Sequence, residues 1–500
     1  MNLQDARATL HKVQEKASAY EHAISLLSYD GETAAPPKTA ANRAHSLGIL
    51  SEEIYKLTTS KENVEVLEYL DEHKDELDEL EQRMVYLLLK GLRFMQKVPM
   101  DEYIGYRKLI VESQEAWKKA KTDNDFNHFA PFLEKTFDTV KKFAAYVDPN
   151  MDPYDFWLNE YEEGLSMEFC EKFFGEVKER IVPLLRKISE KPQVDDSCLL
   201  GDFCEYTQEK FAFYLMDVIG LDRDHVGFGL AEHPFTTSLG SHFDERITTH
   251  YYRENVSYSM FSVVHEGGHA LYDTGSADNL AYTALDGGVS MAVHESQSRF
   301  YENILGRSKA FSALILPKMK ELWLEKFKDV TADELYKAVN KVRPSLIRTE
   351  ADEVTYALHV LVRYELEKKI FHNELEIKDL PSEWNRLYKK YLGVDVPDDS
   401  HGVLQDVHWS EGLIGYFPSY AIGSAYGAQF LQKMKEKVDV DSCIAKGDFA
   451  PINDWNREHI WKFGSSKTPS EILEIALGEP FTTDAYAKYL EDKYSEIYNL

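Results

Sequence analysis

Two histidines and a glutamate occur in the order His-Glu-x-x-His within the segment SVVHEGGHALYD, at His265, Glu266 and His269. The apolar residues around them predict a helix, and residues four apart on a helix project from the same face. Both imidazoles can therefore bind one Zn²⁺ ion. Glu266 is placed to take a proton from the water that attacks a substrate. These residues predict a metal-dependent hydrolase.

The alternative interpretation of this short motif is a helix with two surface histidines. Gly267 and Gly268 argue against that alternative, because each costs about 1 kcal/mol relative to alanine inside a helix. Two adjacent glycines therefore imply a packing or functional reason, such as close approach of another backbone or of a substrate.

A catalytic zinc site usually has three protein ligands and one open position, so a third ligand must come from elsewhere in the chain. The segment from Val289 to Leu305 predicts a second amphipathic helix, which offers His294 and Glu295. Glu295 would complete a set of two histidines and one glutamate. His294 is the competing candidate, and the spacing favours Glu295 only slightly.

Histidines that bind a metal generally donate their other ring N–H to a carboxylate or a carbonyl. Asp273, four residues past His269, could accept this bond, and Asp286 is an alternative. A solvated surface position for either aspartate is equally consistent with the sequence.

The composition excludes several classes of partner. A formal net charge of −29 over 500 residues repels nucleic acids and anionic lipids. The four cysteines are too few and too scattered for a disulfide scaffold. We find no secretory signal and no apolar run near the roughly 20 residues that span a bilayer. We therefore expect a cytoplasmic protein with free thiols, without nucleic-acid or membrane partners.

Helical periodicity dominates the chain, which predicts a mainly α fold in one domain of two lobes around a cleft. Pro36 and Pro37, and the segment 148–153, predict breaks between helices. The segment from Val226 to Arg253 is rich in Thr, Phe and Tyr and predicts a small sheet. Helices are expected over residues 3–29, 79–94, 167–188, 207–218 and 332–342.

Six blocks between residues 233 and 420 resemble, in order, motifs of the carboxypeptidase Taq family of metallocarboxypeptidases. The blocks are HPF at 233–235, DERIT at 244–248, HEGGH at 265–269, HESQSR at 294–299, IRTEADEVTY at 347–356 and GVLQDVHW at 402–409. The resemblance implies a helical fold similar to neurolysin and angiotensin-converting enzyme, with a deep substrate groove and a small β-sheet. The region before His233 contributes no motif.

The resemblance also implies Glu295 as the third ligand, with one Zn²⁺ per subunit; Co²⁺ or Mn²⁺ are possible substitutes. It implies a homodimer that releases single residues from the C-termini of peptides, with broad specificity and proline disfavoured. An oligopeptidase or a dipeptidyl carboxypeptidase with the same zinc site is the nearest alternative. A non-catalytic helical scaffold with a structural metal is the alternative from another class, although structural zinc sites are usually rich in cysteine.

Arg348 is the leading candidate to bind the C-terminal carboxylate of a peptide, because a planar guanidinium matches a carboxylate with paired hydrogen bonds. Glu350, Asp352 and Glu353 are close in sequence and could orient it. The alternative interpretation is a buried Arg–Asp pair that only braces two helices.

Peptide hydrolysis develops an oxyanion, which needs a hydrogen-bond donor near the metal. Tyr420 and His408 are the candidates for this role, and Tyr416 is the substitute or a substrate-binding residue. Asp406 could orient His408, although a helix-capping role would give the same sequence.

Strands near Asp244 could align an extended peptide through backbone pairing. Asp244 and Arg246 are expected to hold the shape of a hairpin. His233, before Pro234, is a candidate substrate-binding residue and is equally consistent with a structural role.

Overall fold

The computed structural model describes residues 1–500, and its chain divides into two compact units. Unit 1 comprises residues 1–92, 196–339 and 430–480. Unit 2 comprises residues 93–195, 340–429 and 481–500. Each unit is therefore built from three separate stretches of chain.

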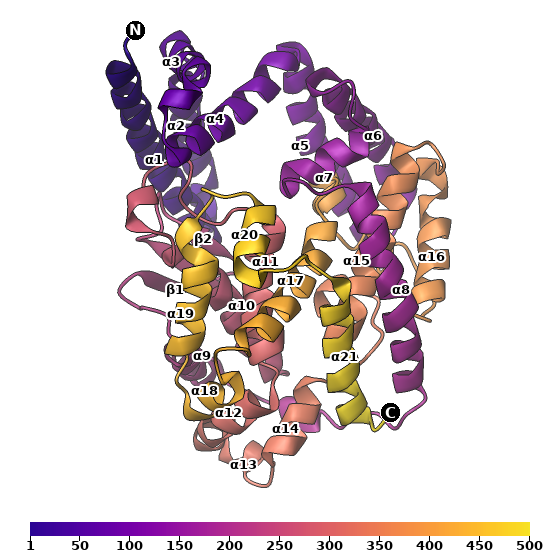
Figure 1. Ribbon diagram of the computed structural model, residues 1–500. Helices are drawn as coiled ribbons and strands as arrows, with labels where there is room; N and C mark the ends of the chain where they lie inside the picture. The colour runs from indigo at the N-terminus through magenta and orange to yellow at the C-terminus, as the bar shows by residue number, and fades with distance from the viewer. The chain divides into compact units, whose positions relative to one another are not determined.

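Unit 1 contains most of the helices and the sheet (Figure 1). Its helices are α1 (Leu3–Thr33), α2 (Ala40–Thr58), α3 (Lys61–Glu72), α4 (Glu79–Lys97, which begins here), α9 (Glu205–Ile219), α10 (Val256–Thr274), α11 (Met291–Arg299), α12 (Lys309–Leu322), α13 (Leu324–Phe327), α14 (Ala332–Val339), α18 (Val440–Lys446), α19 (Ala450–His459) and α20 (Pro469–Leu477).

Three short strands form the sheet, in the order β1 (Val226–Leu230), β3 (Glu245–Thr249) and β2 (Thr236–Ser238). β1 pairs with β3 in parallel, and β2 pairs with β3 antiparallel. Helix α10 contacts β3 and β2. The predicted small sheet is confirmed, and it lies beside the helix that carries the His-Glu-x-x-His motif.

Local sequence explains where the two motif helices begin. The side chain of Asn255 accepts a hydrogen bond from the backbone N–H of Ser257 and caps α10. The side chain of Ser290 does the same for Val293 and caps α11. Such caps satisfy backbone donors that a helix leaves without an intrahelical partner.

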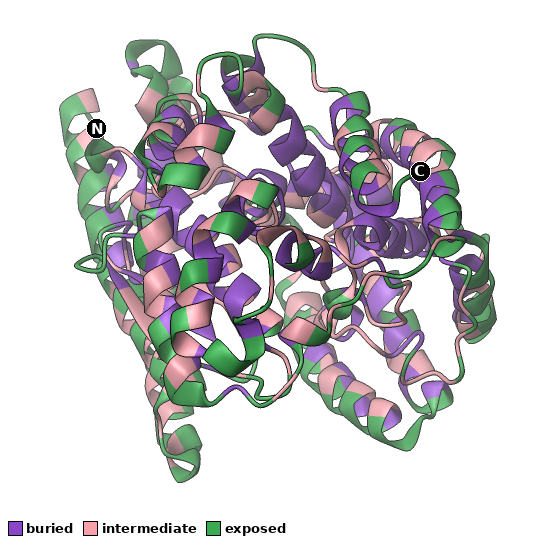
Figure 2. Ribbon diagram, turned by 90° about the horizontal axis from the view of Figure 1, so that it is seen from below, coloured by how far each residue is buried: buried purple, intermediate pink, exposed green.

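Apolar residues at helical spacing build the core of the N-terminal part of unit 1. They come from α1, α3 and α4, with one residue between α3 and α4 and two residues after α10: Ala6, Leu10, Val66, Leu67, Leu70, Leu77, Met84, Val85, Leu89, Leu92, Leu280 and Leu285. The opposite side of α1 is exposed along much of its length (Figure 2). This division is what an amphipathic helix produces.

Unit 2 is all helical. Its helices are α5 (Met100–Asp123), α6 (Phe126–Val147), α7 (Pro153–Tyr161), α8 (Met167–Ser189), α15 (Glu353–Phe371), α16 (Leu380–Tyr391), α17 (Pro418–Met434, which begins here) and α21 (Thr483–Tyr498). Helix α15 is buried on all sides and contacts α6, α7, α8 and α16. Its buried polar residues, His359, Arg363 and Glu367, require partners inside the unit.

The helices predicted over residues 3–29, 79–94, 167–188 and 207–218 are present as α1, α4, α8 and α9, each extending a few residues further. The predicted breaks at Pro36 and Pro37 and at 148–153 are also present. No helix of the chain is both long and apolar enough to span a bilayer.

Two helix predictions need correction. The helix predicted over residues 332–342 is present as α14 but ends at Val339. The segment 289–305 is α-helical only from Met291 to Arg299, and residues Phe300–Leu305 form a π-helix. The backbone N–H of Gly306 donates to the carbonyl of Tyr301, five residues earlier. Single-turn π segments are frequent at functional sites, and side-chain periodicity does not reveal them.

Candidate metal and catalytic site

Three side chains of unit 1 converge as a metal site requires. One ligand atom each from His265, His269 and Glu295 lie within 4.8 Å of one another. Glu295 Oε2 is 3.9 Å from His265 Nε2 and 3.7 Å from His269 Nε2. Ligands at zinc distances around a tetrahedral centre are about 3.4 Å apart, so a small contraction would complete the site. The residues fit a divalent metal ion.

The second oxygen of Glu295 is occupied by an arginine. Arg299 Nε donates to Glu295 Oε1 at 2.7 Å, and the side chain of Glu295 is only 9% exposed. The Ser298 hydroxyl lies 3.3 Å from Oε2. These contacts turn one oxygen of the carboxylate toward the histidines and hold the other away from them.

The outward ring nitrogen of His265 contacts a buried carboxylate. His265 Nδ1 lies 2.9 Å from Glu302 Oε2, and Glu302 also accepts from Arg299 Nη1 at 3.3 Å and Arg307 Nη2 at 3.0 Å. Burial alone would raise the pKa of Glu302, but Arg299 and the hydrogen bond from His265 outweigh it and hold this pKa far below its usual value. An ionised Glu302 fixes the tautomer that leaves Nε2 to bind a metal.

His269 is oriented through a second histidine. His269 Nδ1 is 2.6 Å from His294 Nδ1, and His294 Nε2 is 3.1 Å from both carboxylate oxygens of Asp273. Burial and the nearby His294 lower the pKa of His269 well below its usual value, which keeps it neutral as a ligand must be. His294 therefore lies behind His269, and Asp273 holds it.

Asp286, the alternative partner, is used elsewhere. Its Oδ1 lies 2.6 Å from His242 Nδ1, and its Oδ2 accepts from the backbone N–H of His242 at 3.2 Å. This contact joins the loop before β3 to the loop that follows α10.

Close backbone packing explains one of the two glycines in the motif. A Cβ atom on Gly268 would lie 2.8 Å from the carbonyl oxygen of Gln297 and 2.8 Å from the Cα of Ser298. Because both atoms belong to the backbone of α11, only glycine lets α10 approach so closely. This approach places Glu295 beside the two histidines, which confirms the packing reason that the sequence implied.

Glu266 is buried beside the metal group. Thr236 Oγ1, on β2, is 2.7 Å from Glu266 Oε2. Burial raises the pKa of Glu266, and His265 and the threonine hydroxyl oppose that rise only in part. A carboxylate with a raised pKa next to a metal site is suited to accept a proton and to release it again.

Arg348 belongs to unit 2 and is paired with an aspartate. Arg348 Nε and Nη2 both lie 2.9 Å from Asp406 Oδ1, and its Nη1 is 3.4 Å from Tyr356 Oη. Asp406 Oδ2 accepts from Arg363 at 2.7 and 2.9 Å. The buried Arg–Asp pair that the sequence left open is therefore present.

Asp352 and Glu353 have other partners and do not orient Arg348, which corrects that part of the expectation. Asp352 caps α15 by accepting from the backbone N–H groups of Val354 and Thr355. Glu353 accepts from Lys493 at 2.7 Å. The partner of Arg348 comes instead from a segment distant in sequence, through Asp406.

His408 and Tyr420, the two candidates for oxyanion stabilisation, contact each other. His408 Nε2 is 3.1 Å from Tyr420 Oη, and the Arg348 guanidinium lies over the Tyr420 ring at 4.9 Å from its centroid. Tyr416 packs edge-on against Tyr420, with ring centroids 5.1 Å apart. Burial and the charge of Arg348 lower the pKa of His408 to about 4. A neutral imidazole beside a phenol can donate or accept a hydrogen bond near neutral pH.

Asp406 does not orient His408, contrary to the sequence expectation. Its carboxylate is occupied by Arg348 and Arg363, and His408 Nδ1 makes no hydrogen bond to it. Two guanidinium groups compete more strongly for this carboxylate than a neutral imidazole does.

Glu367 positions the segment that carries His408. Its buried carboxylate accepts from Trp409 Nε1 at 2.7 Å, from Tyr154 Oη at 2.9 Å and from the backbone N–H of Gly415 at 3.0 Å. Burial raises the pKa of Glu367 to about 7, although all three donors oppose the rise.

This shift predicts a pH-dependent stability. An acid whose folded pKa is raised from 4.5 to about 7 contributes stability below its unfolded pKa, and this contribution is lost as pH rises through 7. We expect it to lower the free energy of unfolding by on the order of 2 kcal/mol between pH 5 and pH 8. Glu367→Gln, neutral throughout, should have a flatter dependence in urea unfolding, although its absolute stability is lower. Equal slopes in both proteins would rule out this assignment.

The remaining candidates lie around the sheet. His233 is exposed, in the loop between β1 and β2. Asp244 and Arg246 form an ion pair of 2.8 Å at the start of β3, so their predicted structural role is confirmed.

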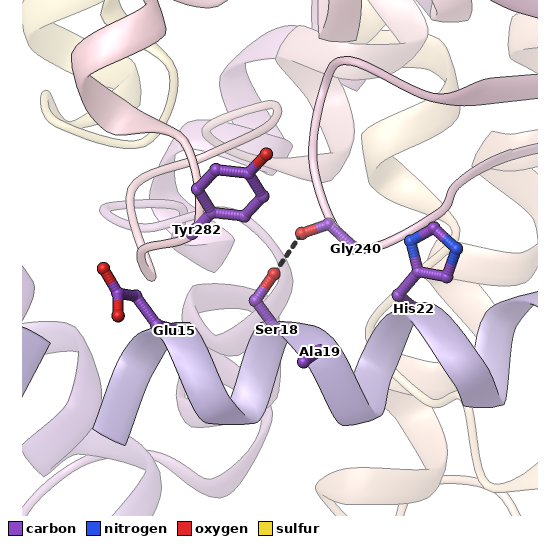
Figure 3. Close-up of a pocket in the computed structure, with 6 residues that line it drawn as sticks. All are labelled: Glu15, Ser18, Ala19, His22, Gly240 and Tyr282. Carbon is purple, nitrogen blue, oxygen red and sulfur yellow. Dashed lines mark hydrogen bonds between the residues drawn. The ribbon is translucent and has the colours of Figure 1, made fainter. Parts of the chain in front are cut away.

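A separate cavity of about 450 Å³ opens on unit 1, at the face of α1 (Figure 3). Its lining consists of Glu15, Ser18, Ala19 and His22 on that helix, with Gly240 and Tyr282 from two loops. The Ser18 hydroxyl donates to the carbonyl of Gly240 across it. None of the six residues belongs to the metal group.

Several site residues were missed by sequence reasoning. Arg299 and Glu302 follow Glu295 at four and seven residues, so they share its helix face, and this spacing could have identified them. No spacing or motif in the sequence pointed to Thr236 or Arg363 as site residues.

Comparison with known proteins decides the family. The family model of carboxypeptidase Taq (M32) metallopeptidases matches residues 9–494. The chain belongs to this family. It is 38% identical to carboxypeptidase 1 of Bacillus subtilis, over 97% of both chains. It is 37% identical to thermostable carboxypeptidase 1 of Pyrococcus furiosus, over 95% of this chain and 96% of the relative.

The fold agrees with the same family. The crystal structure of the M32 carboxypeptidase from Deinococcus radiodurans superposes with a TM-score of 0.96 at 34% identity, over 99% of this chain and 100% of that chain. The enzyme is therefore a metallocarboxypeptidase, which requires a divalent metal ion. The predicted family, the mainly helical fold and the enzyme class are confirmed.

Proposed function

We propose that this enzyme is a zinc carboxypeptidase that releases single C-terminal residues from peptides with broad specificity, proline being disfavoured. The observation that carries the zinc assignment is the group of His265, His269 and Glu295, whose ligand atoms face one another. Two imidazoles and one carboxylate form a typical catalytic zinc set. Co²⁺ or Mn²⁺ are possible substitutes.

When bound, zinc would supply Lewis acidity to the scissile carbonyl and to the attacking water. The chain's own contribution begins with Glu266, which takes the proton from that water and delivers it to the leaving amine. The raised pKa of Glu266 supports both steps, since a moderately basic carboxylate can accept a proton and then give it up. No covalent intermediate is required.

Arg348 is proposed to bind the terminal carboxylate of the peptide. A guanidinium carries five N–H donors, and the contacts with Asp406 and Tyr356 account for three of them. The aspartate would hold the guanidinium plane in place, while the remaining donors bind the substrate. Pre-ordering of this kind reduces the entropy that is lost on binding.

Tyr420 is proposed to donate a hydrogen bond to the oxyanion, with His408 as its partner and Tyr416 as the substitute or a substrate contact. The 3.1 Å contact between His408 Nε2 and Tyr420 Oη supports a shared role. His233 is proposed to contact substrate, and its exposure in the loop before β2 is compatible with that role.

The remaining proposals concern the whole molecule. We propose one catalytic domain over residues 1–500, because the family model matches residues 9–494 without a break into separate domains. We further propose a cytoplasmic homodimer with one Zn²⁺ per subunit and peptides as substrates, without nucleic-acid or membrane partners.

The decisive experiment compares peptides that differ only at the C-terminus. The zinc-loaded enzyme should shorten free-acid peptides one residue at a time and leave the matched amidated peptides intact, as followed by mass spectrometry. Arg348→Ala should raise KM for free-acid peptides at least tenfold, the loss of a charge-assisted hydrogen bond. Metal analysis of the purified enzyme would identify the ion.

Other product patterns would redirect the proposal. Release of dipeptides would indicate a dipeptidyl carboxypeptidase, and internal fragments would indicate an oligopeptidase. Equal cleavage of amidated peptides would remove carboxylate recognition by Arg348.

A further inference from the structure

The proton acceptor of the proposed reaction is tied to the sheet by one hydroxyl group. Thr236 Oγ1 lies 2.7 Å from Glu266 Oε2 and 3.0 Å from the backbone carbonyl of the same residue. A hydroxyl has one proton, and the shorter contact is the one to the carboxylate. Hydrogen bonds to a charged acceptor are shorter and stronger than neutral ones.

Strand geometry fixes the position of Thr236. The residue before it, Phe235, exchanges two bonds with Thr248: its N–H donates to the threonine hydroxyl at 2.8 Å, and its carbonyl accepts from the backbone N–H at 2.9 Å. Thr236 itself pairs with Ile247 of β3. Side chains alternate along a strand, so Thr236 turns toward α10 while Thr237 turns to the opposite face.

The hydrogen bond from Thr236 uses one acceptor position of Oε2, which favours the other oxygen, Oε1, as the proton acceptor. Glu266 is only 7% exposed, so little bulk solvent competes with the threonine hydroxyl for its carboxylate. A hydrogen bond to one oxygen disfavours rotation of the carboxylate away from this orientation. Proton transfer requires the base to lie within hydrogen-bond reach of its proton, and small misplacements are costly.

We propose that Thr236 is a positioning residue that holds the carboxylate of Glu266 in its reactive orientation. This inference rests on the proposed role of Glu266. It assigns a task in the reaction to the threonine that follows the HPF block, through a residue of the sheet and not of the metal-binding helices. The competing explanation is that Thr236 only ties β2 to α10 through the backbone carbonyl of Glu266.

Removal of the hydroxyl tests the proposal. Thr236→Val preserves the shape of the side chain and should lower kcat about 10- to 100-fold, the effect of losing a hydrogen bond to a charged group. KM and zinc affinity should change less than twofold, because Thr236 touches neither ligand nor substrate in this scheme. Thr236→Ser, which restores the hydroxyl, should recover most of kcat, and Thr237→Val serves as the matched control on the opposite face.

A double-mutant cycle with Glu266→Gln separates positioning from a structural tie. If Thr236 acts through the carboxylate, Thr236→Val should lower kcat in the parent enzyme but not in the Glu266→Gln background. A strand tie alone would instead lower thermal stability and zinc affinity in both backgrounds. Should Thr236→Val fail to fold, Thr236→Ala and Thr236→Ser provide the same comparison.

The outcomes distinguish the two levels of inference. Near-parental kcat in Thr236→Val, with Glu266→Gln inactive, would overturn the role of Thr236 and leave the proposed function intact. Near-parental kcat in Glu266→Gln would overturn the general base itself.

Discussion

Glu266→Gln is expected to lower kcat on the order of 10³-fold while the protein keeps its metal ion, because general acid–base catalysis contributes about 10²- to 10⁴-fold. Glutamine has nearly the same shape but cannot accept a proton as a carboxylate does. The group of ligand atoms consists of His265, His269 and Glu295 and does not include Glu266. Metal analysis and single-turnover kinetics would check both parts of this expectation.

The control for this prediction is Glu295, the proposed third metal ligand. Glu295→Gln should lose zinc affinity and activity together, since it removes a charged ligand and the partner of Arg299. If Glu266→Gln also lost the metal, low turnover could not be assigned to proton transfer. If it retained most of its activity, Glu266 would have no place in the mechanism.

Gly268→Ala is expected to damage the metal site without changing any group that touches the metal. The added Cβ would lie 2.8 Å from backbone atoms of Gln297 and Ser298, and backbone cannot rotate aside. Helix α11 must therefore move away from α10, and Glu295 moves with it. We expect at least a tenfold weaker zinc affinity. Overpacking should cost about 1–3 kcal/mol, which outweighs the gain of about 1 kcal/mol in helix propensity.

Gly267→Ala is the matched control on the adjacent residue. Its Cβ would meet Ile219 Cδ1 at 2.5 Å and Leu221 Cδ1 at 3.1 Å, which are the ends of flexible side chains. These can rotate, so zinc affinity should stay within a few-fold of the parent. Competition with a chelator, and thermal unfolding of the metal-free proteins, would compare both variants. Equal effects would show that close helix packing is not the reason for Gly268.

The sequence predicted the long helices more accurately than the irregular segments that follow them. Helical periodicity predicted α1, α4, α8 and α9, because one apolar face per helix is enough to mark a helix. It did not predict the π-helix at Phe300–Leu305, because an i→i+5 turn depends on how the segment packs.

At the site, the sequence alone identified the residues whose spacing on one helix already brings them together. His265 and His269 are one turn apart, so any helix over this segment makes them a pair. The choice between His294 and Glu295 is different, since adjacent residues on a helix point in different directions. Which one faces the histidines depends on the rotation of α11 against α10, a property of tertiary packing.

The tertiary structure also decided which side chains form hydrogen bonds with the candidate site residues. Asp406 pairs with Arg348 rather than His408, and Thr236 reaches Glu266 from a strand, although neither pair is close in sequence. A hydrogen bond is a matter of distance and direction in space. Local sequence therefore determined which side chains could take part in the reaction. Only the fold decided which atom of each side chain is used in a hydrogen bond and which atom is left to act on the metal or the substrate.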